Sequence, residues 1–469
     1  MGLKIYNSLT RQKEEFKPLE KGKVSMYVCG PTVYGPPHVG HARSYTNFDV
    51  VNRYLQFLGY KVKYVQNITD VGHLVGDGDE GEDKILAQAK REQVDPFEIA
   101  YKYEVNYFDK MDKLNILRPS ISARATGFIP QMIEMVEDIV KKGYGYVTKN
   151  GNVYFSVRKF NDYGQLSNRK LDKNLSGERI EIAGDKQAPE DFALWKKAEG
   201  GHLMKWKSPW SEGYPGWHLE CSTLTKIFLG KTFDIHGGGI DNIFPHHECE
   251  CAQSQVANGQ KFVNYFMHNN LITVDGTKMG KSLGNFITLE DLFKEYDPLY
   301  VRYFILLFHY RTPVDFTKKA IGEAGEQLEK LRNAYKIAKE LSNGKEIQPA
   351  NAQVVEMFNN FISAMNEDFN TPLAISELLK AIKLANTVKQ ENNAKVAGEL
   401  LFVLNRINFV LGLGLEQAKE ENKSSNEQVL MDIISEVRTA LRQEKNYQMS
   451  DLIRDRLNQN GIVISDKKV

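Results

Sequence analysis

The chain has 469 residues, of which 42% are hydrophobic and 26% charged, the balance of a soluble globular protein. This length predicts about two to four domains. The net charge of +1 argues against a protein that coats nucleic acid without selectivity, because such binding needs many phosphate contacts.

Membrane and secretion signals are missing from the sequence pattern. The apolar run from Tyr303 to Phe308 is far too short to span a bilayer. The first residues, MGLKIYNSLT, lack the apolar core of a signal peptide, so we expect a cytoplasmic protein. Four cysteines are too few for a disulfide framework, and metal binding or plain burial is expected of them.

The N-terminal elements predict an α/β fold with a parallel sheet. Residues Val24–Cys29 form an apolar strand, and Pro36 and Pro37 suit the first turn of a helix. Apolar residues then recur at helical spacing, at Phe48, Val51, Leu55 and Leu58. Val62–Gln66 alternates as a second strand, which completes a strand–helix–strand unit of Rossmann type. No GxGxxG follows the first strand, and this counts against a dinucleotide enzyme.

His38 and His41 occupy the position where such a fold binds phosphates. They are three residues apart and share one face of the predicted helix. The N-terminus of a helix is electropositive and favours phosphate groups. Gly40 between them leaves room for an adenine ring close to the backbone.

A second segment, KMGKS, places Lys278 and Lys281 on a glycine-containing loop. Two ammonium groups on such a loop suit charge that develops on phosphates in a transition state. The alternative is a capped helix and an unrelated solvated lysine turn. The presence of both segments favours an ATP phosphate clamp.

The middle of the chain reads as an insertion between two sheet-forming regions. The acidic sequence GDGDEGED, residues 76–83, lacks the longer pattern of a calcium loop and predicts a solvated loop. Residues 117–205 carry mixed patterns, with an alternating stretch at Asn152–Val157. Strand-like segments resume at Lys231–His236 and Phe262–Val274.

Beyond Phe316 the periodicity becomes helical and predicts a bundle. Asn370-Thr371-Pro372 marks a helix start, with Thr371 as cap and Pro372 at the first position. Glu416–Gln428 contains almost nothing apolar and reads as a linker before a small terminal unit. Basic residues in and after this unit are candidate RNA contacts: Arg438, Arg442, Lys445, Arg454, Arg456, Lys467 and Lys468.

The cysteines and histidines suggest a metal site. Cys29 precedes His38, Cys221 ends the segment YPGWHLEC, and HHECEC begins at His246. On a helix, His246 and Glu250 can hold one ion, and so can the pair His247 and Cys251. Spacing does not choose between these pairs. Two of the four cysteines lie next to a His-His-Glu cluster. This favours a metal site over histidines that are simply buried in the core.

The two phosphate segments resemble HIGH and KMSKS, the signatures of class I aminoacyl-tRNA synthetases. Longer segments are similar to the cysteinyl-tRNA synthetase family over nearly the whole chain. These are YVCGPTVYGPPHVGH, NITD at Asn67, LNILRP at Leu114, PEDFALWK at Pro189, PGWHLEC at Pro215, FDIHGGGIDNIFPHHE at Phe233 and KMGKSLGNF at Lys278.

This resemblance implies one zinc ion per chain, held by Cys29, Cys221, His246 and Glu250, with Cys249 and Cys251 as non-ligands. Zinc binds thiolate more strongly than a hydroxyl group, so the metal would select cysteine over serine without an editing domain. Whether the substrate sulfur adds to four ligands or displaces one stays open.

The resemblance also implies a two-step reaction: cysteine and ATP, with Mg²⁺, form cysteinyl-adenylate, and the cysteinyl group passes to the 3′ end of tRNA(Cys). The implied roles are phosphate contacts for His38, His41, Lys278 and Lys281, ATP binding for Gly40, Gly238, Asp241 and Lys281, a cysteine-pocket wall for Trp217, and tRNA contacts for Arg442, Lys445, Arg454 and Arg456. For Trp217, a plain core position is the alternative. We expect a monomer that does not bind membranes.

The expected domains follow from the same resemblance. They are residues 1–116, the first half of the Rossmann catalytic domain; 117–205, the insertion domain; 206–265, the second half with the zinc site; 266–315, the KMSKS-type loop and stem-contact region; 316–415, the tRNA-binding α-helical bundle; and 429–469, a small C-terminal anticodon-binding unit.

Two departures from the family pattern and two rival functions stay open. Gly280 replaces the usual serine of KMSKS, and the sequence stops without the family's short tryptophan-containing tail, which leaves the anticodon contacts undefined. One rival is a related ligase that joins cysteine to a small amine. The other is a zinc-stabilised RNA-binding protein without catalysis. The predicted bundle and basic unit favour tRNA over the first, and the histidine and lysine segments argue against the second.

Overall fold

The computed structural model describes residues 2–74, 81–169, 185–279, 285–417 and 423–459. The chain divides into two compact units, Met1–Glu416 and Gln417–Val469. No described helix combines the length and apolar character needed to cross a membrane.

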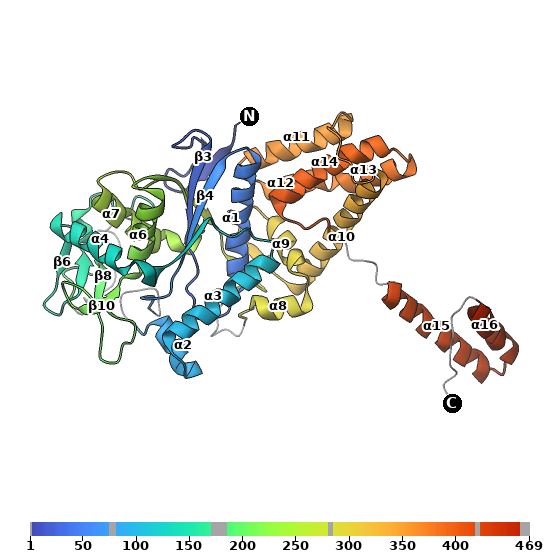
Figure 1. Cartoon of the computed structure of the whole chain (residues 1–469), viewed down its shortest axis with the longest axis horizontal. Helices are drawn as coiled ribbons and strands as arrows, with labels where there is room; N and C mark the ends of the chain where they lie inside the picture. Colours follow the sequence, from blue (N-terminus) through green and yellow to red (C-terminus); the bar gives the residue numbers. More distant parts are fainter. Residues whose placement is uncertain (1, 75–80, 170–184, 280–284, 418–422, 460–469) are drawn as a thin grey trace. The chain divides into compact units, whose positions relative to one another are not determined.

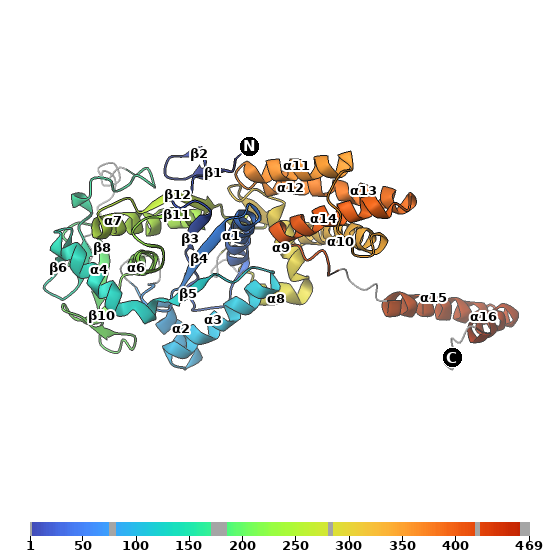
Figure 2. The same cartoon turned by 45° about the horizontal axis from the view of Figure 1, so that its top comes forward.

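A five-stranded parallel sheet lies at the centre of the first unit, in the order β12-β11-β3-β4-β5 (Figures 1 and 2; all five strands are labelled in Figure 2). Its strands are β3 (Lys23–Val28), β4 (Lys61–Ile68), β5 (Ile121–Arg124), β11 (Phe233–Gly239) and β12 (Val263–Asn269). The α/β prediction with a Rossmann-type sheet is confirmed. The chain runs from β3 outward to β4 and β5, then returns on the other side of β3 as β11, so a crevice opens at the carboxyl ends of β3 and β11.

Helices cover both faces of this sheet. Figures 1 and 2 show α1 on one side of β3 and β4 and α6 on the other. The side chains of β3 alternate accordingly: Met26 and Val28 join the core under α1, and Tyr27 joins the core under α6. The helices of this part are α1 (Val39–Phe57), α2 (Lys84–Glu92), α3 (Pro96–Lys113), α4 (Ile129–Lys141), α6 (Trp217–Leu229) and α7 (His246–Asn258).

Three smaller sheets accompany the central one. An N-terminal hairpin pairs β1 (Lys4–Asn7) with β2 (Gln12–Glu15). The insertion forms an antiparallel sheet from β6 (Gly145–Val147), β7 (Val153–Phe155), β8 (Phe192–Lys197), β9 (Trp206–Lys207) and β10 (Glu212–Pro215). The third sheet contains β13 (Ile272–Val274), β14 (Thr277–Lys278) and β15 (Val314–Phe316).

A helical bundle follows, as predicted, and shares one apolar core with α1 and the sheet face beneath it. A buried ion pair joins the bundle to α1: the carboxylate of Asp49 lies 2.7 Å from Arg53 Nε and 2.5 Å from Arg302 Nη2. Arg302 Nε also donates to the Leu411 carbonyl at 2.7 Å. The bundle helices beyond Phe316 are α10 (Lys318–Leu341), α11 (Ala352–Asn366), α12 (Thr371–Leu378), α13 (Lys380–Gln390) and α14 (Ala394–Leu411). Two helices before Phe316, α8 (Leu289–Glu295) and α9 (Pro298–Leu306), lie in the predicted stem-contact region.

Two predicted helix starts were wrong by one or a few residues. Pro36 and Pro37 precede α1 instead of forming its first turn, because His38 is extended and pairs with Thr288. Asn370, not Thr371, caps α12, since its side chain accepts from the Leu373 amide at 3.2 Å.

Two predicted segments also divide differently. Phe262–Val274 contains two strands of different sheets, β12 and β13, separated at Asn270. The predicted linker Glu416–Gln428 is helical from Lys423, where α15 (Lys423–Gln443) begins. This helix and α16 (Tyr447–Gln459) form the second unit.

Candidate functional site

A cavity of about 530 Å³ lies at the carboxyl edge of the central sheet. The ends of β3 and β11, the N-terminal turn of α1 and the start of β13 surround it. This is the crevice where the strand order reverses, which is the usual ligand position in open parallel sheets. Among the predicted site residues, the described ones that line it are Cys29, His38, Gly40, His41, Trp217, Cys221, Asp241 and His246.

His38 and His41 cap α1 reciprocally. His38 Nδ1 accepts from the Gly40 amide at 3.1 Å, and His41 Nδ1 accepts from the His38 amide at 3.1 Å. The two ring centroids are 3.9 Å apart. Burial lowers the pKa of His41 to about 4, so this ring is neutral at physiological pH. Because each Nδ1 accepts a hydrogen bond, Nε2 of each neutral ring carries the proton and is a donor for an anion.

Two glycines of the site avoid steric conflict with histidines. A Cβ at Gly40 would lie 2.8 Å from the ring of His38, so the capping arrangement itself requires glycine there. A Cβ at Gly238 would lie 2.7 Å from the ring of His247. Gly238 is buried behind the cavity, and its neighbour Gly239 is the glycine that lines it, together with Asp241.

The structure describes the lysine segment up to Met279 and again from Asn285. Lys278 ends strand β14, whereas Gly280 and Lys281 lie outside the described residues. On the near side, Met279 lines the cavity, and a Cβ at Gly40 would come within 3.9 Å of it. On the far side, the ring centroid of Phe286 lies 5.1 Å from that of His38. Both flanks of the lysine loop therefore contact the histidine turn.

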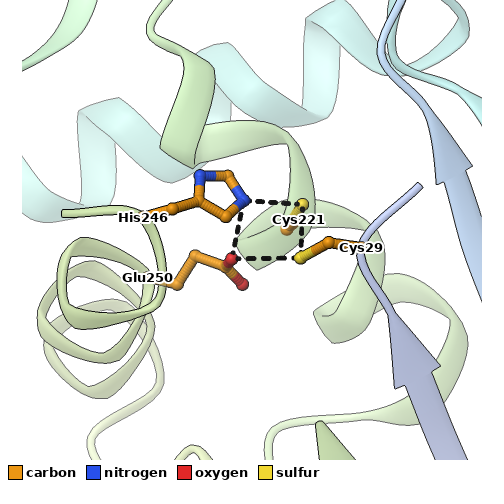
Figure 3. A group of neighbouring side chains, drawn as sticks. All are labelled: Cys29, Cys221, His246 and Glu250. Carbon is orange, nitrogen blue, oxygen red and sulfur yellow. Dashed lines mark hydrogen bonds and ion pairs between the residues drawn. The ribbon is translucent and has the colours of Figure 1, made fainter. Parts of the chain in front are cut away.

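A buried group of four potential metal ligands, Cys29, Cys221, His246 and Glu250, lies beside the cavity, and the first three of them line it. Figure 3 shows their side chains converging from the end of β3, from α6 and from α7. The ligand atoms all lie within 4.8 Å of one another. His246 Nε2 is 3.0 Å from Glu250 Oε1 and 3.5 Å from Cys221 Sγ, and the two sulfur atoms are 3.9 Å apart.

A second set, Cys29, His236, His247 and Glu250, also has its ligand atoms within 4.8 Å of one another, and it shares Cys29 and Glu250 with the first set. Neither His236 nor His247 lines the cavity. His236 Nε2 lies 2.8 Å from Glu250 Oε2, and His247 Nε2 lies 3.2 Å from Cys29 Sγ. These two histidines are placed to orient ligands of the first set, as supporting residues of metal sites do. Cys249 and Cys251 belong to neither set.

The four groups compete for protons in a buried space. Burial opposes ionisation of Cys221, but its hydrogen bond with Cys29 and the charge of His246 lower its pKa to about 6. Burial also opposes ionisation of Glu250, yet His236 and His246 lower its pKa to about 2. The pKa of His246 rises to about 10, because Glu250 and Cys221 outweigh its burial. A divalent cation would take over the charge compensation that the imidazolium provides, so the donor set fits a metal ion.

Trp217 is half-buried and forms part of the cavity wall, so the plain core alternative does not describe its position. Its ring stacks on His246 with centroids 4.3 Å apart and on His73 with centroids 4.0 Å apart. His73 Nδ1 in turn hydrogen-bonds the hydroxyl of Thr32. His73 could not be predicted from the sequence, because a lone histidine before an acidic loop shows no periodic signal.

The basic residues of the second unit differ in exposure. Lys445 and Arg456 are exposed, whereas Arg454 forms ion pairs with Asp451 at 3.0 Å and Asp455 at 3.4 Å. Arg438 is buried and donates to the Ser450 carbonyl at 3.2 Å, so it joins α15 to α16 instead of facing solvent. Lys467 and Lys468 lie outside the described residues.

Comparison with known proteins identifies two family models in the chain. Residues 15–326 match the class I (C) tRNA synthetase catalytic domain, and residues 360–416 match the DALR domain. The cysteine–tRNA ligase of Chlorobaculum tepidum is 48% identical over 480 residues, covering 99% of this chain and 97% of that protein. The cysteine–tRNA ligase of Thermus thermophilus is 44% identical, covering 100% of this chain and 98% of that protein.

Solved structures with low sequence identity share the fold. Methionyl-tRNA synthetase of Mycobacterium tuberculosis, in complex with methionyl-adenylate, aligns with a TM-score of 0.61 at 14% identity, covering 87% of this chain and 96% of that chain. A leucyl-tRNA synthetase of Agrobacterium radiobacter aligns with a TM-score of 0.64 at 11% identity, covering 86% and 85%.

The ligand group predicts a selective loss of metal. Cys221→Ser removes one of the four potential ligands and is expected to lower the affinity for a divalent metal such as zinc by at least roughly 10 to 100-fold, the range seen for supporting residues alone. Zinc content after dialysis against a graded chelator measures the effect. Cys249→Ser is the matched control, because Cys249 is also a buried cysteine, in α7 beside His246 and Glu250, but its sulfur lies 3.4 Å from Tyr163 Oη. Equal zinc retention by the two variants would contradict the assignment.

Proposed function

The chain belongs to the cysteine–tRNA ligase family of class I aminoacyl-tRNA synthetases, and we propose how its own residues carry out ATP-dependent ligation of cysteine to tRNA. The observation that supports the proposal is that the histidine turn of α1 and the thiols of Cys29 and Cys221 line one cavity. ATP and cysteine can therefore bind with their reacting groups adjacent.

In the first step, a carboxylate oxygen of cysteine attacks the α-phosphorus of ATP, and the bond to pyrophosphate breaks. No protein nucleophile is needed, so catalysis consists of positioning and charge stabilisation. His38 and His41 donate Nε2–H bonds to phosphate oxygens, in the neutral forms that their capping bonds impose. Lys278 and Lys281, with Mg²⁺ bound to ATP, stabilise the leaving pyrophosphate.

One zinc ion would be held by Cys29, Cys221, His246 and Glu250. When bound, zinc supplies a borderline-soft Lewis acid that binds a thiolate more strongly than a hydroxyl group. His236 and His247 orient the carboxylate and the Cys29 thiol. Trp217 forms a wall of the cysteine pocket and holds His246 by stacking.

The remaining cavity residues suit the adenosine. Gly40 and Met279 both line the cavity beside the histidine turn, where the adenine ring is proposed to lie. Asp241 is exposed at the rim, after Gly239 at the end of β11, and its carboxylate can accept hydrogen bonds from ribose hydroxyl groups. Gly238 contributes indirectly, by making room for His247.

In the second step, a terminal ribose hydroxyl of tRNA attacks the carbonyl carbon of the adenylate and releases AMP. The match to the DALR domain supports tRNA binding by the bundle. The exposed Lys445 and Arg456 of the second unit, together with Arg442 and Arg454, are proposed to contact tRNA(Cys) near its anticodon. Activity on a small amine is the alternative, and alignment over 97% of a cysteine–tRNA ligase argues against it.

The role of the lysine loop predicts a change in turnover. Lys281→Ala is expected to lower turnover in pyrophosphate exchange by roughly 30 to 1,000-fold, because a contact to transition-state charge contributes about 2 to 4 kcal/mol. The affinity for ATP should change far less. Lys294→Ala is the control, since Lys294 is exposed and pairs with Asp291 outside the loop. Weakened ATP affinity with normal turnover would refute the assignment.

The role of the second unit predicts a separation of the two steps. Truncation after Glu416 keeps the first compact unit, including the 2.6 Å hydrogen bond from Asn408 to Glu416. Cysteine-dependent pyrophosphate exchange should stay nearly unchanged, whereas charging of tRNA should fall strongly. Binding of tRNA by the full chain should weaken with salt, and less steeply in Lys445→Ala. Normal charging by the truncated protein would reject the second unit as a tRNA contact.

A further inference from the structure

Arg43 is a buried cation that the reaction scheme above does not use. It lies in α1, two residues after His41, and only 1% of its surface is exposed. It nevertheless lines the cavity. Within the described part of the chain, no acidic residue pairs with it, and its Nη1 has no hydrogen-bond partner.

The guanidinium of Arg43 instead bonds three backbone carbonyls. Nε donates to Asn270 at 2.8 Å, and Nη2 donates to Tyr310 at 3.3 Å and to Thr312. These carbonyls belong to two chain segments separated by the lysine loop and by helices α8 and α9. One side chain thus fastens both segments to the helix that carries the histidines.

The two segments lead directly into the sheet that carries the lysine loop. Asn270 precedes β13, and Thr312 precedes β15, its parallel neighbour. Strand β13 pairs antiparallel with β14, which ends at Lys278 and enters the loop. The contacts of Arg43 therefore fix the strand from which the lysine loop departs.

The other end of the loop is fixed to α1 separately. Thr288 forms a β-bridge with His38, and the Leu289 amide donates to the Pro37 carbonyl at 2.8 Å. Arg43 holds the incoming side of the loop, and this bridge holds the outgoing side. These contacts thus fix both ends of the lysine loop relative to the histidine turn.

A buried arginine is an energetically unfavourable residue for holding these backbone segments. Burial lowers the pKa of Arg43 to about 10, so the side chain remains charged at neutral pH. A buried charge without an ionic partner is unfavourable unless its hydrogen bonds are well made. The planar guanidinium can donate to several carbonyls in different directions, which the side chains of lysine and apolar residues cannot do.

We propose that Arg43 is a positioning residue for amino-acid activation, which fixes the sheet of β13, β14 and β15, the sheet that leads into the lysine loop, relative to the histidine turn. The proposal rests on the proposed function of Lys281. Arg43 acts through the backbone at Asn270, Tyr310 and Thr312.

Arg43→Lys tests these contacts, because lysine keeps the positive charge but lacks the planar guanidinium that bonds the three carbonyls. We expect turnover in pyrophosphate exchange to fall by roughly 10 to 100-fold, as a displacement of about 1 Å can cost that much. In a Lys281→Ala background the same change should cost less than about threefold, because coupled sites are not additive. Asn270→Ala removes the 2.9 Å hydrogen bond from the Asn270 side chain to the Arg311 carbonyl, which joins the same two segments. This variant should show the same coupling to Lys281→Ala.

Arg302→Lys is the matched control. Arg302 is fully buried and also bonds three backbone carbonyls, at Leu114, Asn115 and Leu411, away from the lysine-loop sheet. Its effect should multiply with that of Lys281→Ala. Thermal unfolding of each variant separates loss of folded protein from loss of turnover, and Asn270→Ala decides the case if Arg43→Lys does not fold.

The outcomes distinguish the two proposals. Normal turnover in Arg43→Lys, or effects of Arg43→Lys and Lys281→Ala that multiply, would overturn the role of Arg43 while the role of Lys281 stands. Normal turnover in Lys281→Ala would overturn the lysine assignment itself, and the role of Arg43 with it.

Discussion

The shared edge at which parallel strands end is the constraint on which the site depends. Cys29 directly follows β3, Gly239 ends β11, and α1 begins with His38 at the same edge, so residues far apart in sequence line one cavity. Because β11 returns on the opposite side of β3 from β4, the edge opens into a crevice there. The thiols approach this crevice from the α6 face and the histidine turn from the α1 face, which places the four potential metal ligands next to the proposed phosphate contacts.

Burial gives each of these two sites its chemistry. At the histidine turn, reciprocal capping and a lowered pKa keep His41 neutral, so it offers an N–H group to a phosphate without adding charge. In the ligand group, burial raises the pKa of the Cys29 thiol, whereas His246 helps Cys221 to ionise. A divalent ion would compete with those protons for the same donors, which explains why the ligand set needs supporting histidines such as His236.

The sequence was sufficient for the sheet and the histidine turn, and the family resemblance named four candidate ligands that the structure brings together, because those features are local patterns or long motifs. It was insufficient where partners are distant in the chain. His246 and His247 are equivalent by spacing, and only packing shows that His246 reaches the cavity while His247 supports Cys29. Thr371 and Asn370 are both good caps, but the hydroxyl of Thr371 bonds the Phe308 carbonyl, which leaves the cap to Asn370.

The most direct test of the account is pyrophosphate exchange with each standard amino acid in turn, measured on zinc-loaded protein and again after chelation. The account predicts exchange with cysteine alone, with serine slower by roughly 10⁴-fold or more, as a site built around a specific polar contact allows. It also predicts that exchange disappears with the metal and returns when zinc is restored. Exchange that continues at full rate in protein shown to contain no metal would contradict the claim that thiol recognition depends on the buried ligand group.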